Sequence, residues 1–190
     1  MKYAFFASGF RESRGKHTGT KSNAYLVRDE YQSPECTVRY VEYDDDPKKY
    51  AQDLASQWKD GDTVTLTGYS WGAGNWCRKF LWSLYRINPD IKVQHLHLID
   101  PVVYVKFFWW LAITDMGWIS IPRSVQNLSL QYQTEDEPNA SKIKVTNDTR
   151  VLLEQQLPYP HTKIDNADEV TEVVLNVAER FLGNKKAPAC

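Results

Sequence analysis

Short apolar and β-branched runs alternate along the chain with segments whose apolar residues recur every three or four positions. Each short run predicts a strand, and each periodic segment predicts a helix. Strands are expected at 3–8, 37–43, 63–67, 92–99 and 127–134, with a last short strand at either 142–145 or 151–154. Because strands that alternate with helices form right-handed βαβ units, the pattern predicts an α/β fold with a mostly parallel sheet of about five to six strands and helices on both faces.

The helices are marked by their first residues and by their apolar stripes. Asp46 followed by Pro47 is typical of an N-cap with proline in the first turn. Behind Gly72, six apolar residues share one helical face and predict one long helix: Ala73, Trp76, Cys77, Phe80, Leu81 and Leu84. A last helix is predicted over 166–182, and a weaker helical pattern lies at 23–29.

The composition is that of a folded globular protein, with 42% apolar, 13% aromatic and 25% charged residues in a chain of 190. This length fits a single domain over 1–190. The formal net charge of −1 supplies no field that would recruit nucleic acid. Cys36, Cys77 and Cys190 are too widely spaced for a disulfide framework or a zinc site. Because the apolar start is too short for a secretory leader, we expect a cytoplasmic protein.

The pattern Gly-x-Ser-x-Gly occurs at 68–72, between a predicted strand and the long helix. A strand, a tight turn and a helix in this order are what a nucleophile elbow requires. The serine of such a turn is strained, so its neighbours two residues away must be small, as Gly68 and Gly72 are. The helix that begins at Ser70 favours negative charge developing there. The pattern indicates a nucleophilic serine; the simpler interpretation is a glycine-rich βα loop in which Ser70 caps the helix.

With this elbow, followed along the chain by an acid and then a histidine, residues 3–182 resemble a minimal α/β-hydrolase, similar to small lipases and esterases. The resemblance implies a three-layer fold and a serine hydrolase that cleaves carboxylic esters, thioesters included, through an acyl-enzyme on Ser70. It also implies a small acyl ester or lipid as substrate, with no cofactor and no metal.

The resemblance places the catalytic histidine in a loop between the last strand and the last helix, where His161 lies. The other histidines are His17, His95 and His97. His95 and His97 are two residues apart on a predicted strand and therefore share one face of the sheet. Packing inside the protein is their ordinary interpretation. The alternative is a metal-dependent hydrolase that uses these two side chains with Asp100.

Two positions compete for the carboxylate that would orient the histidine. Asp100 directly follows the strand at 92–99 and precedes a proline, an arrangement similar to that of pancreatic-type lipases. The other position is one strand later, in the acidic cluster Glu135, Asp136 and Glu137, where Asp136 is the alternative acid. We favour Asp100, because the end of a strand holds a carboxylate rigidly.

Two backbone N–H groups are expected to form the oxyanion hole. One belongs to Trp71, the residue after the nucleophile. The other is assigned to Phe10, in the loop after the first strand. Members of the superfamily often carry His-Gly in this loop, whereas this chain carries Ser8 and Gly9. Because the contact is made by backbone, the difference in side chain matters little.

Residues 102–122 are strongly apolar and aromatic and follow Asp100, where α/β-hydrolases insert lids. We interpret them as a lid or pocket wall with an exit strand in the same sheet; Lys106 and Asp115 argue against a transmembrane helix. The expected substrate-binding residues are Tyr69, Phe107, Phe108, Trp109 and Trp110. Other interpretations of the insert are a buried helix, an interfacial membrane contact or a homodimer face. They leave an alternative function, a non-catalytic α/β-hydrolase-fold module that binds a protein or membrane partner.

Overall fold

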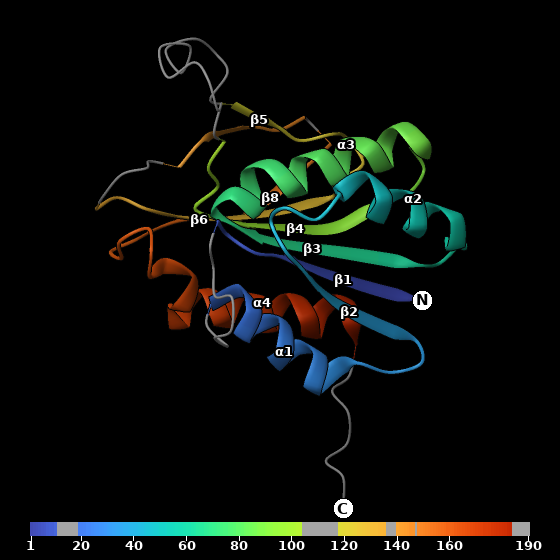
Figure 1. Cartoon of the computed structure of the whole chain (residues 1–190), viewed down its shortest axis with the longest axis horizontal. Helices are drawn as coiled ribbons and strands as arrows, with labels where there is room; N and C mark the ends of the chain where they lie inside the picture. The colour runs from blue at the N-terminus through green and yellow to red at the C-terminus, as the bar shows by residue number, and fades with distance from the viewer. Residues whose placement is uncertain (11–18, 104–117, 136–139, 147, 184–190) are drawn as a thin grey trace, which may run out of the picture.

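A six-stranded sheet forms the centre of the molecule (Figure 1). The computed structural model describes residues 1–10, 19–103, 118–135, 140–146 and 148–183. The strands lie in the order β2-β1-β3-β4-β6-β8, and every neighbouring pair is parallel. Their bounds are Lys2–Ala7 (β1), Cys36–Val41 (β2), Thr63–Tyr69 (β3), Val93–Ile99 (β4), Asn127–Gln133 (β6) and Arg150–Leu157 (β8). The strand number and the parallel direction confirm the prediction from the sequence.

Helices cover both faces of this sheet (Figure 1). One face is covered by α1 (Gly19–Tyr31) and α4 (Asp168–Leu182), and the other by α2 (Pro47–Gln57) and α3 (Arg78–Ile87). The three layers confirm the α/β architecture expected from the alternation of strands and helices. The weak helical pattern at 23–29 belongs to the longer α1.

The first residues of α2 agree with the prediction from the sequence, whereas those of the helix after the elbow differ from it. The Asp46 side chain accepts a hydrogen bond from the Lys48 N–H and caps α2, as predicted. The helix after the elbow differs, because it begins as a π-helical stretch, Gly72–Cys77, before α3 continues it. In this stretch the helix backbone meets other chain segments closely: a Cβ on Gly74 would lie 2.0 Å from the Val102 carbonyl oxygen. Such π-helical turns are frequent at functional sites.

Both candidates for the last strand form, but in different sheets. Residues 150–157 make the edge strand β8, whereas β7 (Lys142–Lys144) pairs with β5 (Trp118–Ser120) in a separate two-stranded sheet. The exit strand expected after the insert does join the main sheet: it is β6, which pairs with β4 in parallel. The short strand β5 precedes it and lies outside this sheet. Ile119 still anchors β5, because its side chain is buried in the main core.

The larger core lies between the sheet and the α2 and α3 layer. Its centre is aromatic: Phe5, Trp76 and Phe80 are in mutual ring contact, and the Trp76 and Phe80 rings stack with centroids 5.1 Å apart. This packing fixes the helix that begins at the elbow against β1 and β3. The end of β3 is thereby held rigidly at the carboxyl edge of the sheet, where ligands bind in open parallel sheets.

Candidate active site

Ser70 lies in a strained turn directly after β3. Its φ is 51°, a left-handed value that residues with a side chain adopt rarely. The glycines two residues away are required by space. A Cβ on Gly68 would lie 2.5 Å from the Cys77 sulfur, and one on Gly72 would lie 2.2 Å from the Ser8 carbonyl oxygen. The turn has the geometry of a nucleophile elbow.

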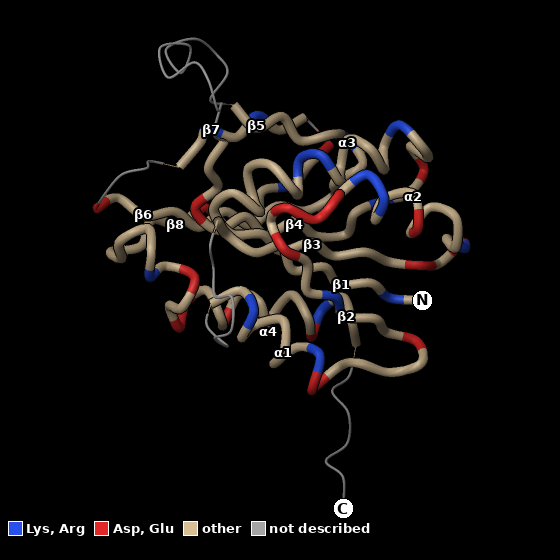
Figure 2. Tube along the Cα trace, viewed as in Figure 1, with Lys and Arg blue, Asp and Glu red and all other residues tan. Residues whose placement is uncertain are grey.

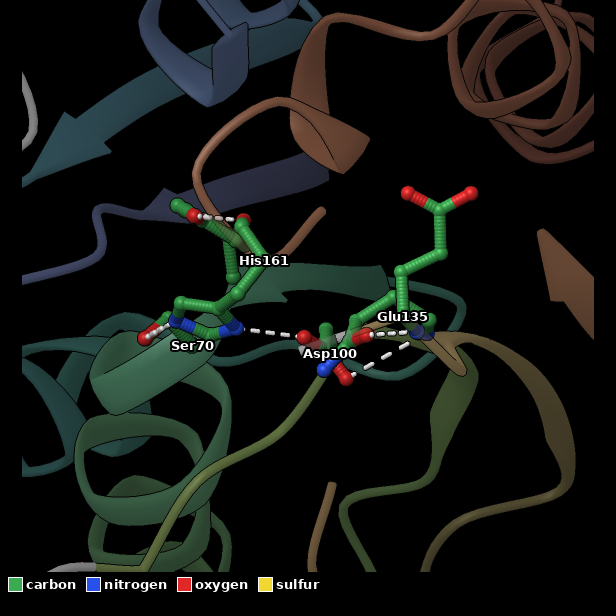
Figure 3. Close-up of polar contacts among 6 residues, drawn as sticks. Ser70, Asp100, Glu135 and His161 are labelled. Carbon is green, nitrogen blue, oxygen red and sulfur yellow. Dashed lines mark hydrogen bonds and ion pairs between the residues drawn. The ribbon is translucent and has the colours of Figure 1, made fainter. Parts of the chain in front are cut away.

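A hydrogen-bonded chain connects Ser70, His161 and Asp100 (Figure 3). Ser70 Oγ lies 2.8 Å from Nε2 of His161. Nδ1 on the other side of the ring is hydrogen-bonded to Oδ2 of Asp100. The Asp100 side chain is fully buried, and the His161 side chain is 12% exposed. The structure therefore brings together the three residues that the sequence analysis selected.

Asp100 is held by the strand beside it. Its backbone N–H donates to the Gln131 carbonyl oxygen at 2.7 Å, and the Gln133 N–H donates to Oδ1 at 3.5 Å. The competing acidic cluster lies directly after the same strand. Glu135 is exposed, and Figure 3 shows its carboxylate pointing away from the His161 ring. The alternative acid Asp136 lies outside the described residues.

His161 lies in a tight loop between β8 and α4, as the resemblance implied. The Lys163 and Ile164 N–H groups donate to the Pro160 carbonyl oxygen at 2.9 and 3.2 Å, which closes the loop around the histidine. Tyr69, expected to bind substrate, is buried beneath it. The Tyr69 hydroxyl donates to the His161 carbonyl oxygen, and the two ring centroids are 5.4 Å apart. The structure thus reveals a contact between the elbow and the histidine loop that no sequence signal indicated.

Three aromatic rings gather beside the elbow. Phe10 and Trp71, the two residues assigned to the oxyanion hole, stack with centroids 5.5 Å apart. Tyr43 contacts both rings, at 5.2 Å from Phe10 and 6.3 Å from Trp71. Phe10 is 49% exposed, so the cluster opens to solvent. Nothing in the sequence indicated that Tyr43 belongs to this cluster. Tyr43 follows β2 and reaches the site only because β2 and β1 are neighbours.

The Phe10 loop packs tightly on the elbow. A Cβ on Gly9 would lie 2.6 Å from a ring carbon of Tyr69 and 3.3 Å from Cβ of Ser70. Glycine at this position therefore lets the loop after β1 approach Ser70. As a result, the backbone segments around Phe10 and Trp71, which are expected to form the oxyanion hole, lie close to each other.

The predicted pocket wall of Phe107, Phe108, Trp109 and Trp110 lies outside the described residues, as does His17. The last part of the expected insert is described and belongs to the body of the fold: Ile119 and Ile121 are buried in the main core. In the part of the chain that the structure describes, no helix combines the length and apolar character that a membrane crossing needs.

His95 and His97 are buried on the α4 side of β4. Nε2 of His97 lies 2.8 Å from Oε1 of Gln131, and the His95 ring contacts Phe181 with centroids 5.6 Å apart. Burial lowers the pKa of His95 to about 3 and that of His97 to about 4, so both are neutral at pH 7. Among the described residues no three potential ligands cluster around a metal site. The geometry therefore contradicts the metal-dependent alternative with Asp100 and supports ordinary packing.

The fold is similar to those of known proteins, although the sequence is not. No protein-family model matches the chain, and no curated protein does. Among solved structures, RedJ thioesterase from the prodiginine biosynthetic pathway of Streptomyces coelicolor aligns with a TM-score of 0.53, over 93% of this chain and 85% of its own, at 10% sequence identity. The fold is that of the α/β-hydrolases.

Two further structures align over nearly the whole chain. A putative hydrolase of the alpha/beta superfamily from Xanthomonas campestris pv. campestris has 14% identity and a TM-score of 0.46, with 95% of this chain and 97% of that chain covered. A cutinase-like protein from Cryptococcus sp. has 12% identity and a TM-score of 0.49, with coverage of 97% and 96%. At these sequence identities the three structures show a likeness of fold alone.

Proposed function

We propose that this protein is a serine hydrolase that cleaves carboxylic esters through an acyl-enzyme on Ser70. The observation that carries the proposal is the continuous chain of hydrogen bonds from Ser70 through His161 to Asp100. A serine hydroxyl is a weak nucleophile unless an adjacent base takes its proton. Nε2 of His161, 2.8 Å from Oγ, is within the range that such a transfer requires.

In the acylation step, Oγ of Ser70 attacks the ester carbonyl carbon while Nε2 of His161 takes the hydroxyl proton. The Asp100 carboxylate keeps the other ring nitrogen protonated and stabilises the imidazolium. We assign the stabilisation of the oxyanion to the backbone N–H groups of Trp71 and Phe10. His161 then gives the proton to the leaving alcohol or thiol as the bond to the carbonyl carbon breaks.

In the deacylation step, water takes the place of the leaving group. His161 removes a proton from this water as it attacks the acyl carbon, and then returns the proton to Oγ of Ser70. The carboxylic acid leaves, and the starting enzyme is restored. No redox change occurs in either step, so the cycle consumes only the ester and one water molecule.

For the substrate we propose acyl esters or thioesters with an apolar or aromatic group. The cluster of Phe10, Tyr43 and Trp71 beside the nucleophile supports this class, because aromatic side chains bind apolar groups through large contact areas. The Phe10 side chain is exposed, and the other two are half-buried. A thioester belongs in the class because RedJ, which is similar in fold, is named a thioesterase. The predicted aromatic wall at 107–110 would extend the same surface.

A panel of ester substrates that differ in the length of the acyl chain tests the proposal. We expect the purified protein to hydrolyse p-nitrophenyl esters, or a matched acyl thioester, and Ser70→Ala to lose at least about a thousandfold in kcat. Ser56→Ala is the matched control, since this surface hydroxyl on α2 only bonds to the Asp53 carbonyl oxygen. Undiminished hydrolysis by Ser70→Ala would contradict the mechanism. No hydrolysis of any panel member by the wild type would favour a non-catalytic binding module.

A further inference from the structure

A cavity of about 290 Å³ lies between the outer side of α3 and β5, and it shares no residue with the Ser70 site. Three of its lining side chains are cationic: Arg78, Lys79 and Arg86. Among the described residues, no acidic side chain lines it, and none forms an ion pair with any of the three cations. Figure 2 shows Lys and Arg positions along α3 and near β5. The cavity therefore concentrates positive charge that the described protein does not neutralise.

The spacing of the cations suits an elongated anion. Arg78 and Arg86 are eight residues apart on one helix, which places them about 12 Å apart along its axis. Lys79 lies beside the first of them. Guanidinium groups bind phosphate oxygens in pairs of parallel hydrogen bonds, and a lysine adds a compact charge. Two arginines with a lysine are the groups that hold phosphates in proteins.

Two indole rings supply a different kind of contact in the same cavity. Nε1 of Trp82 donates to the Ser120 carbonyl oxygen at 3.0 Å, which fixes this ring between α3 and β5. Trp118 is 39% exposed, although tryptophan is mostly buried in folded proteins. The Lys142 ammonium lies over the Trp118 ring, with Nζ 5.6 Å from the centroid. An exposed indole offers a planar ring a stacking surface on the face that the lysine does not cover.

We propose that this cavity binds a nucleotide, with its base against Trp118 and its phosphates on Arg78, Lys79 and Arg86. Both halves of the ligand follow from the lining, since phosphates match the cations and a flat aromatic base matches the indole. The volume of about 290 Å³ is at the lower end of small-molecule pockets, roughly 300 Å³, and exceeds what inorganic phosphate needs. The proposal does not depend on the hydrolase activity, because no lining residue belongs to the Ser70 site.

Isothermal titration calorimetry with the full chain tests the proposal, using ADP, adenosine and pyrophosphate as probes. We expect ADP to bind more tightly than either fragment. Trp118→Ala is expected to weaken ADP about 5- to 150-fold, the range that corresponds to a stacking contribution of about 1–3 kcal/mol, and to leave pyrophosphate unchanged. The double variant Arg78→Ala/Arg86→Ala is expected to weaken ADP and pyrophosphate but not adenosine.

Two controls make the outcome specific. Lys92→Ala removes a surface cation outside the cavity, whose Nζ donates to the Pro89 carbonyl oxygen, and should leave ADP binding unchanged. Ser70→Ala should also bind ADP normally, so a failed hydrolase proposal would not affect this one. Thermal unfolding of each variant checks that it folds.

Three results would overturn the inference. The first is that the wild type binds no ADP. The second is that Trp118→Ala and the double arginine variant bind ADP as tightly as the wild type. The third is that pyrophosphate binds as tightly as ADP, since the cavity would then be a plain anion surface. If the protein bound vesicles of anionic lipid but no ADP, the cavity would instead belong to a membrane-binding surface.

Discussion

Ser70 and Asp100 directly follow residues that are register partners on neighbouring parallel strands, and both have a left-handed backbone. Tyr69 of β3 pairs with Ile99 of β4, and the next residues have φ values of 51° and 41°. In the described part of the chain they are the two residues other than glycine with positive φ. The Val102 N–H donates to the Ser70 carbonyl oxygen at 3.0 Å and joins the two turns. Such strain costs of order 1–3 kcal/mol and is typical of functional sites.

The relationship predicts a large effect of Asp100→Asn. Asparagine tolerates a positive φ, so the turn should form, but an amide cannot keep the His161 tautomer that accepts from Ser70. We expect kcat for ester hydrolysis to fall about 10³- to 10⁴-fold with little change in thermal stability. Glu135→Gln and Asp136→Asn should each retain full kcat. A loss of activity in Asp136→Asn, with Asp100→Asn active, would move the acid one strand later.

A methyl group at Gly72 is predicted to destabilise the fold. The added Cβ would lie 2.2 Å from the Ser8 carbonyl oxygen and 2.6 Å from that of Ala7, both backbone atoms that cannot rotate away. We expect Gly72→Ala to lower the free energy of unfolding by about 3 kcal/mol or more, measured by urea denaturation. Gly61→Asn is the control for backbone strain without a clash: nothing lies within 4 Å of a Cβ there, and asparagine tolerates its φ of 88° better than most residues, so we expect a much smaller loss. Equal stability of the two variants would contradict the close approach.

The parts of the site that the sequence predicted depend on local signals. The elbow at 68–72 is a turn whose strand, glycines and helix are contiguous in the chain. Asp100 could be placed because it follows a strand, and the ends of parallel strands meet at one edge of the sheet. His161 could be placed because the resemblance to the α/β-hydrolases puts the histidine between the last strand and the last helix. Ser70 Oγ contacts the His161 ring, which in turn contacts Asp100, so the three side chains lie together, whereas their catalytic roles stay a proposal.

Other features of the fold and the site depend on packing between segments that are distant in the sequence. No local pattern of residues predicts such packing. Tyr43 reaches Phe10 because β2 lies beside β1, and this neighbourhood is set by the whole sheet. The β5–β7 pair joins residues 118–120 to 142–144, where each run is too short to give a periodic signal. For the same reason the sequence left open whether 142–145 or 151–154 forms the last strand, and the structure contains both.

Tyr69 is predicted to position His161, the proposed catalytic base. Its buried hydroxyl donates to the His161 carbonyl oxygen, and Tyr69→Phe removes this bond without removing the ring. Because a hydrogen bond contributes about 1 kcal/mol, we expect kcat to fall about fivefold with KM unchanged. Tyr159→Phe is the control: the Tyr159 hydroxyl bonds to Glu169 instead, at 3.2 Å, and its loss should leave kcat unchanged. A changed KM with an unchanged kcat would indicate substrate binding by Tyr69.

The buried histidines predict a loss of stability in acid. Burial lowers the pKa of His95 to about 3 and of His97 to about 4, whereas the unfolded chain has histidine pKa values near 6.5. Below about pH 6.5 the unfolded state therefore binds more protons, and the free energy of unfolding falls as the pH falls towards 4. Each histidine contributes a slope of up to about 1.4 kcal/mol per pH unit.

Urea denaturation at pH 7.5, 6 and 5 measures this dependence. The variant His95→Gln/His97→Gln should show a flatter dependence on pH than the wild type, because glutamine does not titrate. The comparison cancels the contribution of the carboxylates, which both proteins share. An equally steep dependence in the variant would show that these two histidines are not the groups that take up protons.

The proposal that Ser70 is an activated nucleophile is tested most directly by fluorophosphonate labelling followed by mass spectrometry of the intact and digested protein. We expect one adduct, on the peptide that contains Ser70, with slower labelling in Asp100→Asn and none in Ser70→Ala. An adduct on another residue, equal labelling of Ser70→Ala, or no labelling of the folded wild type would contradict it.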